Sequence, residues 1–148
     1  MAEQKGYLTV TDIYPQEYQD TTMMYSFWDS LREGKLTTTK CKDCGKISWP
    51  PRLICPECIS DNLEWIDMPE VGKIYTYTIQ VVGLAPGFKP PMVFAVIKFE
   101  NGIRIFSALT DVDPEEVRTG QEVVLNTGKI APDQQGRERI IPYFTLKK

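Results

Sequence analysis

The sequence contains no histidine in its 148 residues. This absence excludes a histidine general base, a Ser-His or Cys-His nucleophile pair and a mixed Cys/His metal site. The sequence also lacks any apolar run near the roughly 20 residues that a membrane-spanning helix needs. Its first ten residues, MAEQKGYLTV, have no apolar core and do not resemble a signal peptide. We therefore expect a cytoplasmic protein without a membrane partner, in a compartment where thiols stay reduced.

Basic charge is scarce as well. The chain has 17 Lys and Arg against 20 Asp and Glu, a formal net charge of −3 and a pI of about 5.1. Sequence-independent binding of nucleic acid needs Lys and Arg side chains clustered so that they contact the phosphates. The densest basic stretch, which lies within residues 137–148, is thin and interrupted by Glu138. This composition disfavours nucleic acid as a partner.

Four cysteines form two C-x2-C pairs, Cys41/Cys44 and Cys55/Cys58, with ten residues between the pairs. Each such turn directs two thiolates at a point about 2.3 Å away, and two turns complete a tetrahedron. Four thiolates leave no open position, so we predict one structural zinc ion, with iron as the substitute in a recombinant host. The alternative is free thiols or two redox pairs. A redox pair would begin a helix after a strand, which Gly45 and the short segment argue against.

Residues 21–33 are predicted to form a helix because apolar residues recur at helical spacing. Asp20 or Thr21 is the expected cap, and Gly34 is the expected left-handed stop. The apolar face either packs on the chain's own barrel or docks on another subunit, and in the second case Trp28 is a partner contact. Four residues make up this face: Met24, Phe27, Trp28 and Leu31.

From residue 71 onward the apolar pattern has period two, which is typical of strands. On the first strand, one face is expected to hold Val71, Tyr75, Tyr77, Ile79 and Val81. The dipeptide Asn101-Gly102 marks a hairpin, because both residues tolerate a positive φ. Five strands and one short helical turn are expected: strands 71–82, 92–100, 103–110, 122–130 and 137–146, with the turn 111–120 between the third and fourth.

This order of elements predicts a mainly β protein with a five-stranded OB-type barrel. A small barrel of SH3 type is the alternative. The expected division of the chain is an N-terminal arm and helix over 1–35, a rubredoxin-like zinc ribbon over 36–68 and the OB-fold barrel over 69–148.

The sequence offers no catalytic constellation. With all four cysteines assigned to metal, no activated nucleophile remains for an enzyme of the chain's own. The acidic residues within 111–116 lie at a predicted helix start, where carboxylates stabilise the positive end of the dipole. The loop 83–91 lacks the pattern of a phosphate-binding loop. It is either a solvent loop or faces a partner or ligand, with Phe88 and Lys89 as the candidate contacts.

Three segments together resemble a known family: FWDSLREGKL (27–36), CKDCGKISWPPRLICPEC (41–58) and VGKIY (71–75). The sequence resembles the zinc-ribbon OB-fold proteins that are classed as a domain of unknown function and associated with acyl-CoA enzymes. The resemblance runs from about residue 22 to the C-terminus. The combination of helix and ribbon motifs is specific, whereas either one alone would be weaker.

The resemblance implies a non-catalytic accessory subunit of a thiolase-type enzyme in a hetero-oligomer. The catalytic subunit would have a thiolase fold, and the accessory subunit would stabilise it or shape its acyl-CoA site, with a coenzyme A thioester at the interface. The family's metal ligands correspond to the four cysteines. Arg52 matches a recurring family position, for which we expect structural support of the ribbon.

Within the family, the resemblance is to small subunits of the kind found in the benzoylsuccinyl-CoA thiolase of anaerobic toluene degradation. Two other roles stay open in the same class: a bridge between acetoacetyl-CoA thiolase and hydroxymethylglutaryl-CoA synthase, or a partner of an acyl-CoA aldolase. A different class is a single-stranded nucleic-acid-binding OB module, which would use Phe94, Phe99 and Phe106. A stand-alone enzyme is the third reading.

Overall fold

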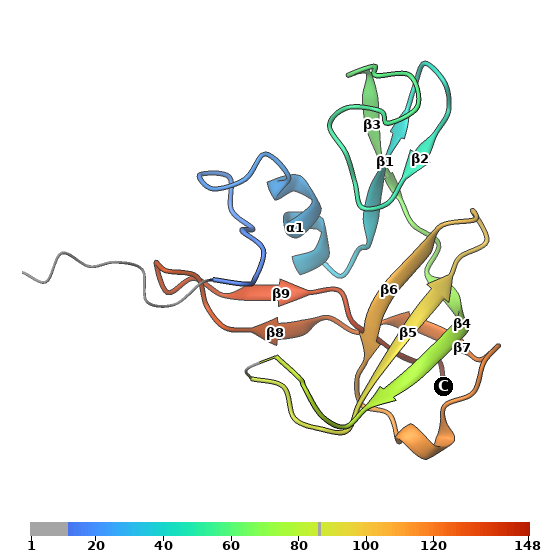
Figure 1. Ribbon diagram of the computed structural model, residues 1–148. Coiled ribbons are helices and arrows are strands. Elements are labelled where there is room, and N and C mark those ends of the chain that lie inside the picture. Colours follow the sequence, from blue (N-terminus) through green and yellow to red (C-terminus); the bar gives the residue numbers. More distant parts are fainter. Residues whose placement is uncertain (1–11, 86) are drawn as a thin grey trace, which may run out of the picture.

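A small three-stranded sheet stands on one end of a closed β-barrel, and an α-helix lies beside their junction (Figure 1). The computed structural model describes residues 12–85 and 87–148. No helix in these ranges is long and apolar enough to cross a membrane. The elements are α1 Tyr25–Arg32, β1 Thr37–Cys41, β2 Ile47–Ser48, β3 Leu63–Asp67, β4 Val71–Gln80, β5 Met92–Lys98, β6 Arg104–Leu109, the 3-10 helix η1 Pro114–Glu116, β7 Glu122–Leu125, β8 Gly128–Ile130, β9 Arg139–Ile141 and β10 Phe144–Leu146.

Helix α1 ends as the sequence predicts. Gly34 has a φ of +82°, and its N–H donates to the Leu31 carbonyl at 3.0 Å. The Lys35 N–H donates to the Ser30 carbonyl, also at 3.0 Å. These two bonds form a Schellman motif, in which a glycine takes the left-handed conformation at the helix end.

The predicted start of α1 is wrong by several residues. The helix begins at Tyr25, and the preceding residue, Met24, makes no side-chain cap. Neither Asp20 nor Thr21 caps it, because residues 18–22 form a turn of their own in which the Thr21 N–H donates to the Tyr18 carbonyl. The Thr22 hydroxyl instead accepts a hydrogen bond from the Met24 N–H at 3.1 Å.

The apolar face of α1 packs within the chain. Phe27 is 5% exposed and Leu31 is 1% exposed. The Phe27 ring meets Trp28 edge-on at 4.9 Å and Trp49 of the ribbon at 5.8 Å between ring centroids. Helix α1 contacts both β1 of the ribbon and β9, so it connects the ribbon to the C-terminal part of the chain. Of the predicted face, Met24 and Trp28 stay half-buried.

The barrel confirms the OB arrangement. Its strands close in the order β10-β6-β5-β4-β7, so the last strand lies between the third and the fourth. β10 runs antiparallel to β7 and parallel to β6, which closes the barrel. This is the five-stranded Greek-key order of an OB fold rather than the SH3 alternative. The fully buried apolar side chains of the core include Phe99, Phe144, Ile74, Ile97, Ile105, Val93 and Val123.

The last two predicted strands, 122–130 and 137–146, are each broken in two. Their outer halves leave the barrel and pair with each other as the β8–β9 hairpin. Asn126 lies at the first break, where its N–H donates to the Tyr143 carbonyl at 2.7 Å. Pro142 lies at the second break, where it has no N–H to continue a ladder. The hairpin therefore projects from the barrel (Figure 1).

The predicted face of the first barrel strand is also wrong. The pairing of β4 with β5 shifts between Ile74 and Thr76, which leaves Tyr75 in a β-bulge. Because a bulge inserts one residue, the inward set changes from Ile74 before it to Tyr77 after it. Tyr75, which the alternation grouped with Tyr77, is 53% exposed, whereas Ile74 is 2% exposed. Beyond the bulge Tyr77 is half-buried, whereas Ile79 and Val81 of the predicted face are 40% and 59% exposed.

Gly72 of β4 lies against the closest-packed part of the core. A Cβ atom there would overlap Ile97 Cγ2 and stand 3.0 Å from the Phe99 ring. Ile97 and Phe99 are 0% and 2% exposed, so neither can move into free space. We expect Gly72→Ala to lower the free energy of unfolding by about 1–3 kcal/mol through overpacking. Urea unfolding measures this, and Lys73→Ala, at the next and exposed position, should change stability by less than about 0.5 kcal/mol.

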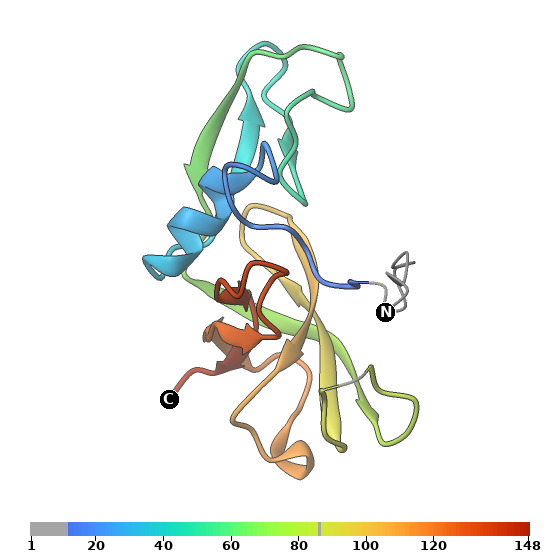
Figure 2. The same cartoon turned by 90° about the vertical axis from the view of Figure 1, so that its left-hand side faces the viewer.

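The segment before α1, residues 12–22, forms an arm along the β8–β9 hairpin (Figures 1 and 2). Glu17 of the arm is 0% exposed. Its carboxylate accepts hydrogen bonds from the Ile140 N–H at 3.0 and 3.2 Å, and it pairs with the Arg32 guanidinium of α1 at 2.6 Å. One buried carboxylate thus joins the arm, the helix and the hairpin.

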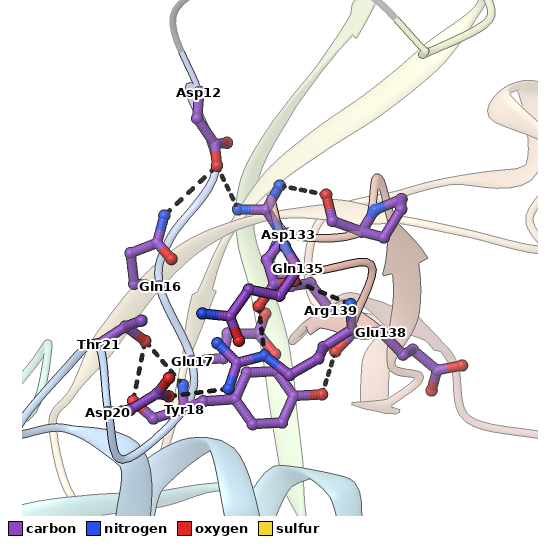
Figure 3. A network of polar contacts seen from close by, with 12 residues as sticks. Asp12, Gln16, Glu17, Tyr18, Asp20, Thr21, Asp133, Gln135, Glu138 and Arg139 are labelled. Atoms are coloured by element: carbon purple, nitrogen blue, oxygen red, sulfur yellow. Dashed lines mark hydrogen bonds and ion pairs between the residues drawn. The ribbon is translucent and has the colours of Figure 1, made fainter.

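Arg139 of β9 is the second buried charge in this network, with 2% of its surface exposed. Its guanidinium pairs with Asp12 at 2.8 Å (Figure 3). It also donates to the carbonyls of Ala131 and Pro132. The Tyr18 hydroxyl donates to the Glu138 carbonyl at 2.6 Å. Each of the three guanidinium nitrogens donates to at least one acceptor, and such hydrogen bonding together with an ion pair is what allows a charge to be buried.

Candidate metal centre and its surroundings

The four cysteine sulfurs converge on one point at the tip of the ribbon. All four Sγ atoms lie within 4.8 Å of one another. Cys41 Sγ is 3.6 Å from Cys58 Sγ, and Cys44 Sγ is 3.5 Å from Cys55 Sγ. A tetrahedron with zinc–sulfur bonds of about 2.3 Å has edges of about 3.8 Å, close to these separations. The predicted metal cluster is therefore confirmed in its geometry.

The two cysteine turns repeat the same backbone structure. The Gly45 N–H donates to the Cys41 carbonyl at 2.9 Å, and the Ile59 N–H donates to the Cys55 carbonyl at 3.0 Å. Gly45 has a φ of +77°, and Ile59 has a φ of +61°. Glycine adopts this conformation easily, and Ile59 takes the same left-handed conformation although it is β-branched. The two turns thus share one backbone conformation, and each directs its pair of sulfurs toward the metal position in the same way.

The cysteine pKa values show why the centre needs a cation. Hydrogen bonds from the backbone N–H groups of Cys58 and Glu57 lower the pKa of Cys55 to about 7. The pKa of Cys58 is raised to about 12, because the Ser60 N–H, which favours its thiolate, is outweighed by the neighbouring sulfurs, Cys41 first. One thiolate forms easily and the next is opposed by it. A divalent cation at the centre removes that opposition and favours all four thiolates.

The donor set fits zinc in a structural role. Four cysteine sulfurs fill all four tetrahedral positions, so water or substrate has no place on the ion. Cys41 and Cys55 are buried, whereas Cys44 and Cys58 are exposed at the ribbon surface. In the part of the chain that the structure describes, no other group of three or more Cys, Asp or Glu is close enough to hold a metal. The chain is therefore built to bind one zinc ion.

The other predicted site residues do not gather around the metal. Trp28 is half-buried against Phe27 on α1. Phe88 is half-buried and Lys89 exposed in the β4–β5 loop, at the end of the barrel away from the ribbon (Figure 1). The structure thus places these three residues in two separate regions. Whether any of them meets a partner stays a prediction.

The acidic residues of 111–116 have structural roles. The Asp113 carboxylate accepts from the Glu115 N–H at 2.9 Å and caps η1, as the sequence predicts. Asp111 has a φ of +55° and accepts from the Asn126 amide at 2.9 Å. Both carboxylates are engaged in the local fold, and neither is directed at a second acid as a catalytic pair would be.

A shallow cleft of about 330 Å³ lies between the ribbon and the β5–β6 hairpin. Three basic residues line it, Lys46 and Arg52 from the ribbon and Arg104 from the barrel. The Arg52 N–H donates to Thr39 Oγ1 at 2.8 Å, so its backbone supports the ribbon. Its guanidinium makes no hydrogen bond or ion pair with any residue in the described ranges. Sequence reasoning missed Lys46 and Arg104, because only the fold brings them beside Arg52.

Comparison with known proteins agrees with this architecture. The rubredoxin-like zinc ribbon domain of the ChsH2 type matches residues 28–64, and the ChsH2 C-terminal OB-fold domain matches residues 65–127. A DUF35 domain-containing scaffold protein of Methanocaldococcus jannaschii is 35% identical over 126 residues, which cover 82% of this chain and 86% of that protein. This chain belongs to the DUF35 family. The family resemblance drawn from the sequence is confirmed.

Other DUF35 relatives have names that refer to enzymes. The benzoylsuccinyl-CoA thiolase subunit BbsA of Thauera aromatica is 31% identical over 108 residues, which cover 73% of this chain and 71% of that protein. Among solved structures, the Ltp2-ChsH2(DUF35) aldolase has a similar chain, with a TM-score of 0.67 and 23% identity. That similarity covers 83% of this chain and 93% of the other, and it supports the fold.

Proposed function

We propose that this DUF35 protein is a non-catalytic accessory subunit that binds a thiolase-type catalytic protein in a hetero-oligomer. The observation that carries the proposal is the likeness to a named thiolase subunit across 73% of this chain, together with the closed four-cysteine centre. The zinc holds the ribbon in shape and leaves no sulfur for chemistry. The chain would stabilise its partner or shape the partner's acyl-CoA site.

The side chains of this protein favour an accessory role over a catalytic one. A thiolase needs an activated cysteine nucleophile and acid-base groups beside it. Here all four cysteines face one another, and the sequence has no histidine. The nucleophile must therefore come from the partner chain.

The finer parts of the proposal concern the partner and its substrate. We assign the chain to a cytoplasmic complex of the benzoylsuccinyl-CoA thiolase kind, as in anaerobic toluene degradation, with a coenzyme A thioester at the interface. We also assign the N-terminal arm and helix to residues 1–35, the zinc ribbon to 36–68 and the barrel to 69–148. Trp28, Phe88 and Lys89 are the proposed contacts with the partner. A bridge between a thiolase and a synthase, or a subunit of an aldolase, would use the same architecture.

The test is reconstitution with defined proteins. Each thiolase-fold protein encoded in the same genome is purified alone and after co-expression with this chain. Size-exclusion chromatography with light scattering then detects a complex, and thiolysis of benzoylsuccinyl-CoA and acetoacetyl-CoA measures activity. We expect one stable complex, no turnover by this chain alone, and higher activity or stability of the catalytic protein in the complex.

Two results would contradict the proposed function. One is the absence of a complex with every thiolase-fold protein tested. The other is turnover of an acyl-CoA by the isolated chain, which would make it an enzyme in its own right. Turnover of only one of the two thioesters by the complex would identify the acyl group.

A further inference from the structure

Exposed aromatic side chains gather on the outer surface of the barrel at β4, β5 and β6. Phe94 and Phe106 stack with ring centroids 5.7 Å apart and ring planes at 13°. Phe106 is 69% exposed, and Tyr75 in the β-bulge is 53% exposed. Val96 is on β5, the middle strand of the three, where it lies opposite Phe106 on β6 and Thr76 on β4. We name this area the outer aromatic face, and it consists of Tyr75, Phe94, Val96 and Phe106.

Three cations lie in one row beside the outer aromatic face. The strand register places Lys73 opposite Lys98, and Lys98 opposite Arg104. In the described ranges none of the three has an ion pair with a carboxylate. The Arg104 guanidinium lies 4.4 Å from the centroid of the Tyr75 ring. Glu122 lies opposite Lys73 on β7, but it forms its ion pair with Lys147 instead.

This cationic row is costly for the isolated chain. Like charges directly opposite each other on neighbouring strands destabilise a sheet. The row does not follow from a general excess of basic residues, because the chain has a net charge of −3. It adjoins the cleft that Arg104 lines together with Arg52, while Lys46 of that cleft pairs with Glu57 at 3.3 Å. Carboxylates supplied by another molecule would remove the repulsion.

We propose that the outer aromatic face and its cationic row form the docking surface for the catalytic protein, through an apolar patch bordered by carboxylates. The inference rests on the proposed function, and it adds a surface separate from the contacts proposed there at Trp28, Phe88 and Lys89. Aromatic residues and Arg at the centre with other charges at the edge are typical of protein interfaces. The exposed Phe106 ring is the apolar anchor, and the row selects an acidic partner surface and speeds association.

Single-stranded nucleic acid is the other molecule that this face of an OB fold could hold. Such binding needs aromatic rings free to stack on successive bases. Here Phe94 and Phe106 stack on each other, and Phe99, the third aromatic considered for this role, is buried at 2% exposure. Three cations on a chain of net negative charge also neutralise few phosphates. The surface therefore favours an acidic protein.

The test measures binding of variants to the thiolase-fold protein that forms the complex with the wild-type chain. Phe106→Ser removes the anchor, and the double variant Lys73→Glu, Lys98→Glu reverses most of the row. We expect each to raise the Kd by about tenfold or more. The charge reversal should slow association and reverse the direction of its salt dependence, because like charges then face each other. Melting curves and zinc content confirm that each variant is folded.

Two matched controls change the same chemistry elsewhere. Ile59→Ser removes an apolar side chain of similar exposure, 73%, on the ribbon. Lys148→Glu reverses an exposed charge at the C-terminal residue. Both should leave the Kd within about twofold, because surface changes away from an interface have small effects.

Several results would overturn the docking surface. If the wild-type chain forms the complex and Phe106→Ser and the charge reversal bind as well as it does, another surface is used and the proposed function still stands. A loss confined to Ile59→Ser would move the interface to the ribbon. Tight binding of a labelled single-stranded oligonucleotide, lost in Phe106→Ser, would assign the face to nucleic acid. If no thiolase-fold protein binds the wild type, the proposed function and this surface both fail.

Discussion

Replacing Cys41 with serine is expected to release the zinc and unfold the ribbon while the barrel stays folded. Zinc binding to a four-cysteine segment supplies an apparent free energy of about 10–16 kcal/mol near pH 7, and this is folding energy. The ribbon strands β1, β2 and β3 bury little apolar surface of their own, so they have no core to replace the metal. The barrel has a separate closed ladder of five strands.

The measurement is metal content by mass spectrometry together with amide NMR spectra. We expect the zinc to fall from one ion per chain to none, with loss of dispersed signals from 37–67 and their retention in the barrel. Helix α1 should loosen as well, because Phe27 rests on Trp49. Lys42→Ser, between the first two ligands, is the control and should keep its zinc. Normal zinc content and unchanged thermal stability in the Cys41→Ser variant would contradict this expectation.

Replacing Glu17 with alanine is expected to detach the N-terminal arm from the hairpin. The change leaves the Ile140 N–H without its acceptor and removes the 2.6 Å partner of Arg32, which keeps only the exposed Asp29. Removing one partner of a buried ion pair costs about 3–5 kcal/mol, and the partial exposure of Arg32 places this pair near the lower end. Hydrogen exchange of residues 12–20 and 133–141 should accelerate, and the melting temperature should fall.

Asp29→Ala provides the matched control for the Glu17 change. Asp29 pairs with the same guanidinium at 3.3 Å, but its side chain is 63% exposed. Exposed pairs contribute about 0–1 kcal/mol, so this variant should keep the exchange pattern of the wild type. Equal effects of the two substitutions would show that burial of Glu17 does not hold the arm.

The arm should also respond to pH through Glu17. Burial raises the pKa of its carboxyl from 4.5 to about 7, against the opposing influence of the Ile140 N–H, Arg32 and Arg139. Because the folded pKa is the higher one, the protonated group contributes stability in full below about pH 4.5, and this is lost as the pH rises through 7. Asp12 acts oppositely at lower pH, since its hydrogen bond to Arg139 lowers its pKa. Between pH 5 and 7.5, the protection factor at Ile140, which corrects for the intrinsic pH dependence of amide exchange, should fall in the wild type but not in Glu17→Gln.

The metal centre was predictable from the sequence because its determinants are local. The spacing within and between the two C-x2-C pairs fixes where four sulfurs can meet, and the glycine after the first pair, Gly45, has the positive φ that glycine favours. The matching turn at the second pair has Ile59 where the first has glycine, so the left-handed conformation there could not be predicted from the residue type. The strands of the barrel were also predictable, because period-two patterning reports burial on one face.

What the sequence could not give depends on contacts between distant segments. Glu17 and Ile140 are 123 positions apart, and neither residue type predicts the pairing. The bulge at Tyr75 reverses an alternation that otherwise looks regular. The cationic row was hidden for a similar reason. A two-residue Asn101-Gly102 turn would place Lys98 opposite Ile105, but the observed turn is one residue longer and places it opposite Arg104.

The central claim is that all four thiols are committed to one metal ion, which leaves the chemistry to a partner. Zinc content and thiol reactivity, measured on one sample of the purified wild-type chain, test it most directly. The account predicts one zinc per chain, no thiol that reacts with Ellman's reagent in the folded protein, and four reactive thiols after denaturation with a chelator. A chain without bound metal, or with a thiol that reacts in the folded state, would contradict the account.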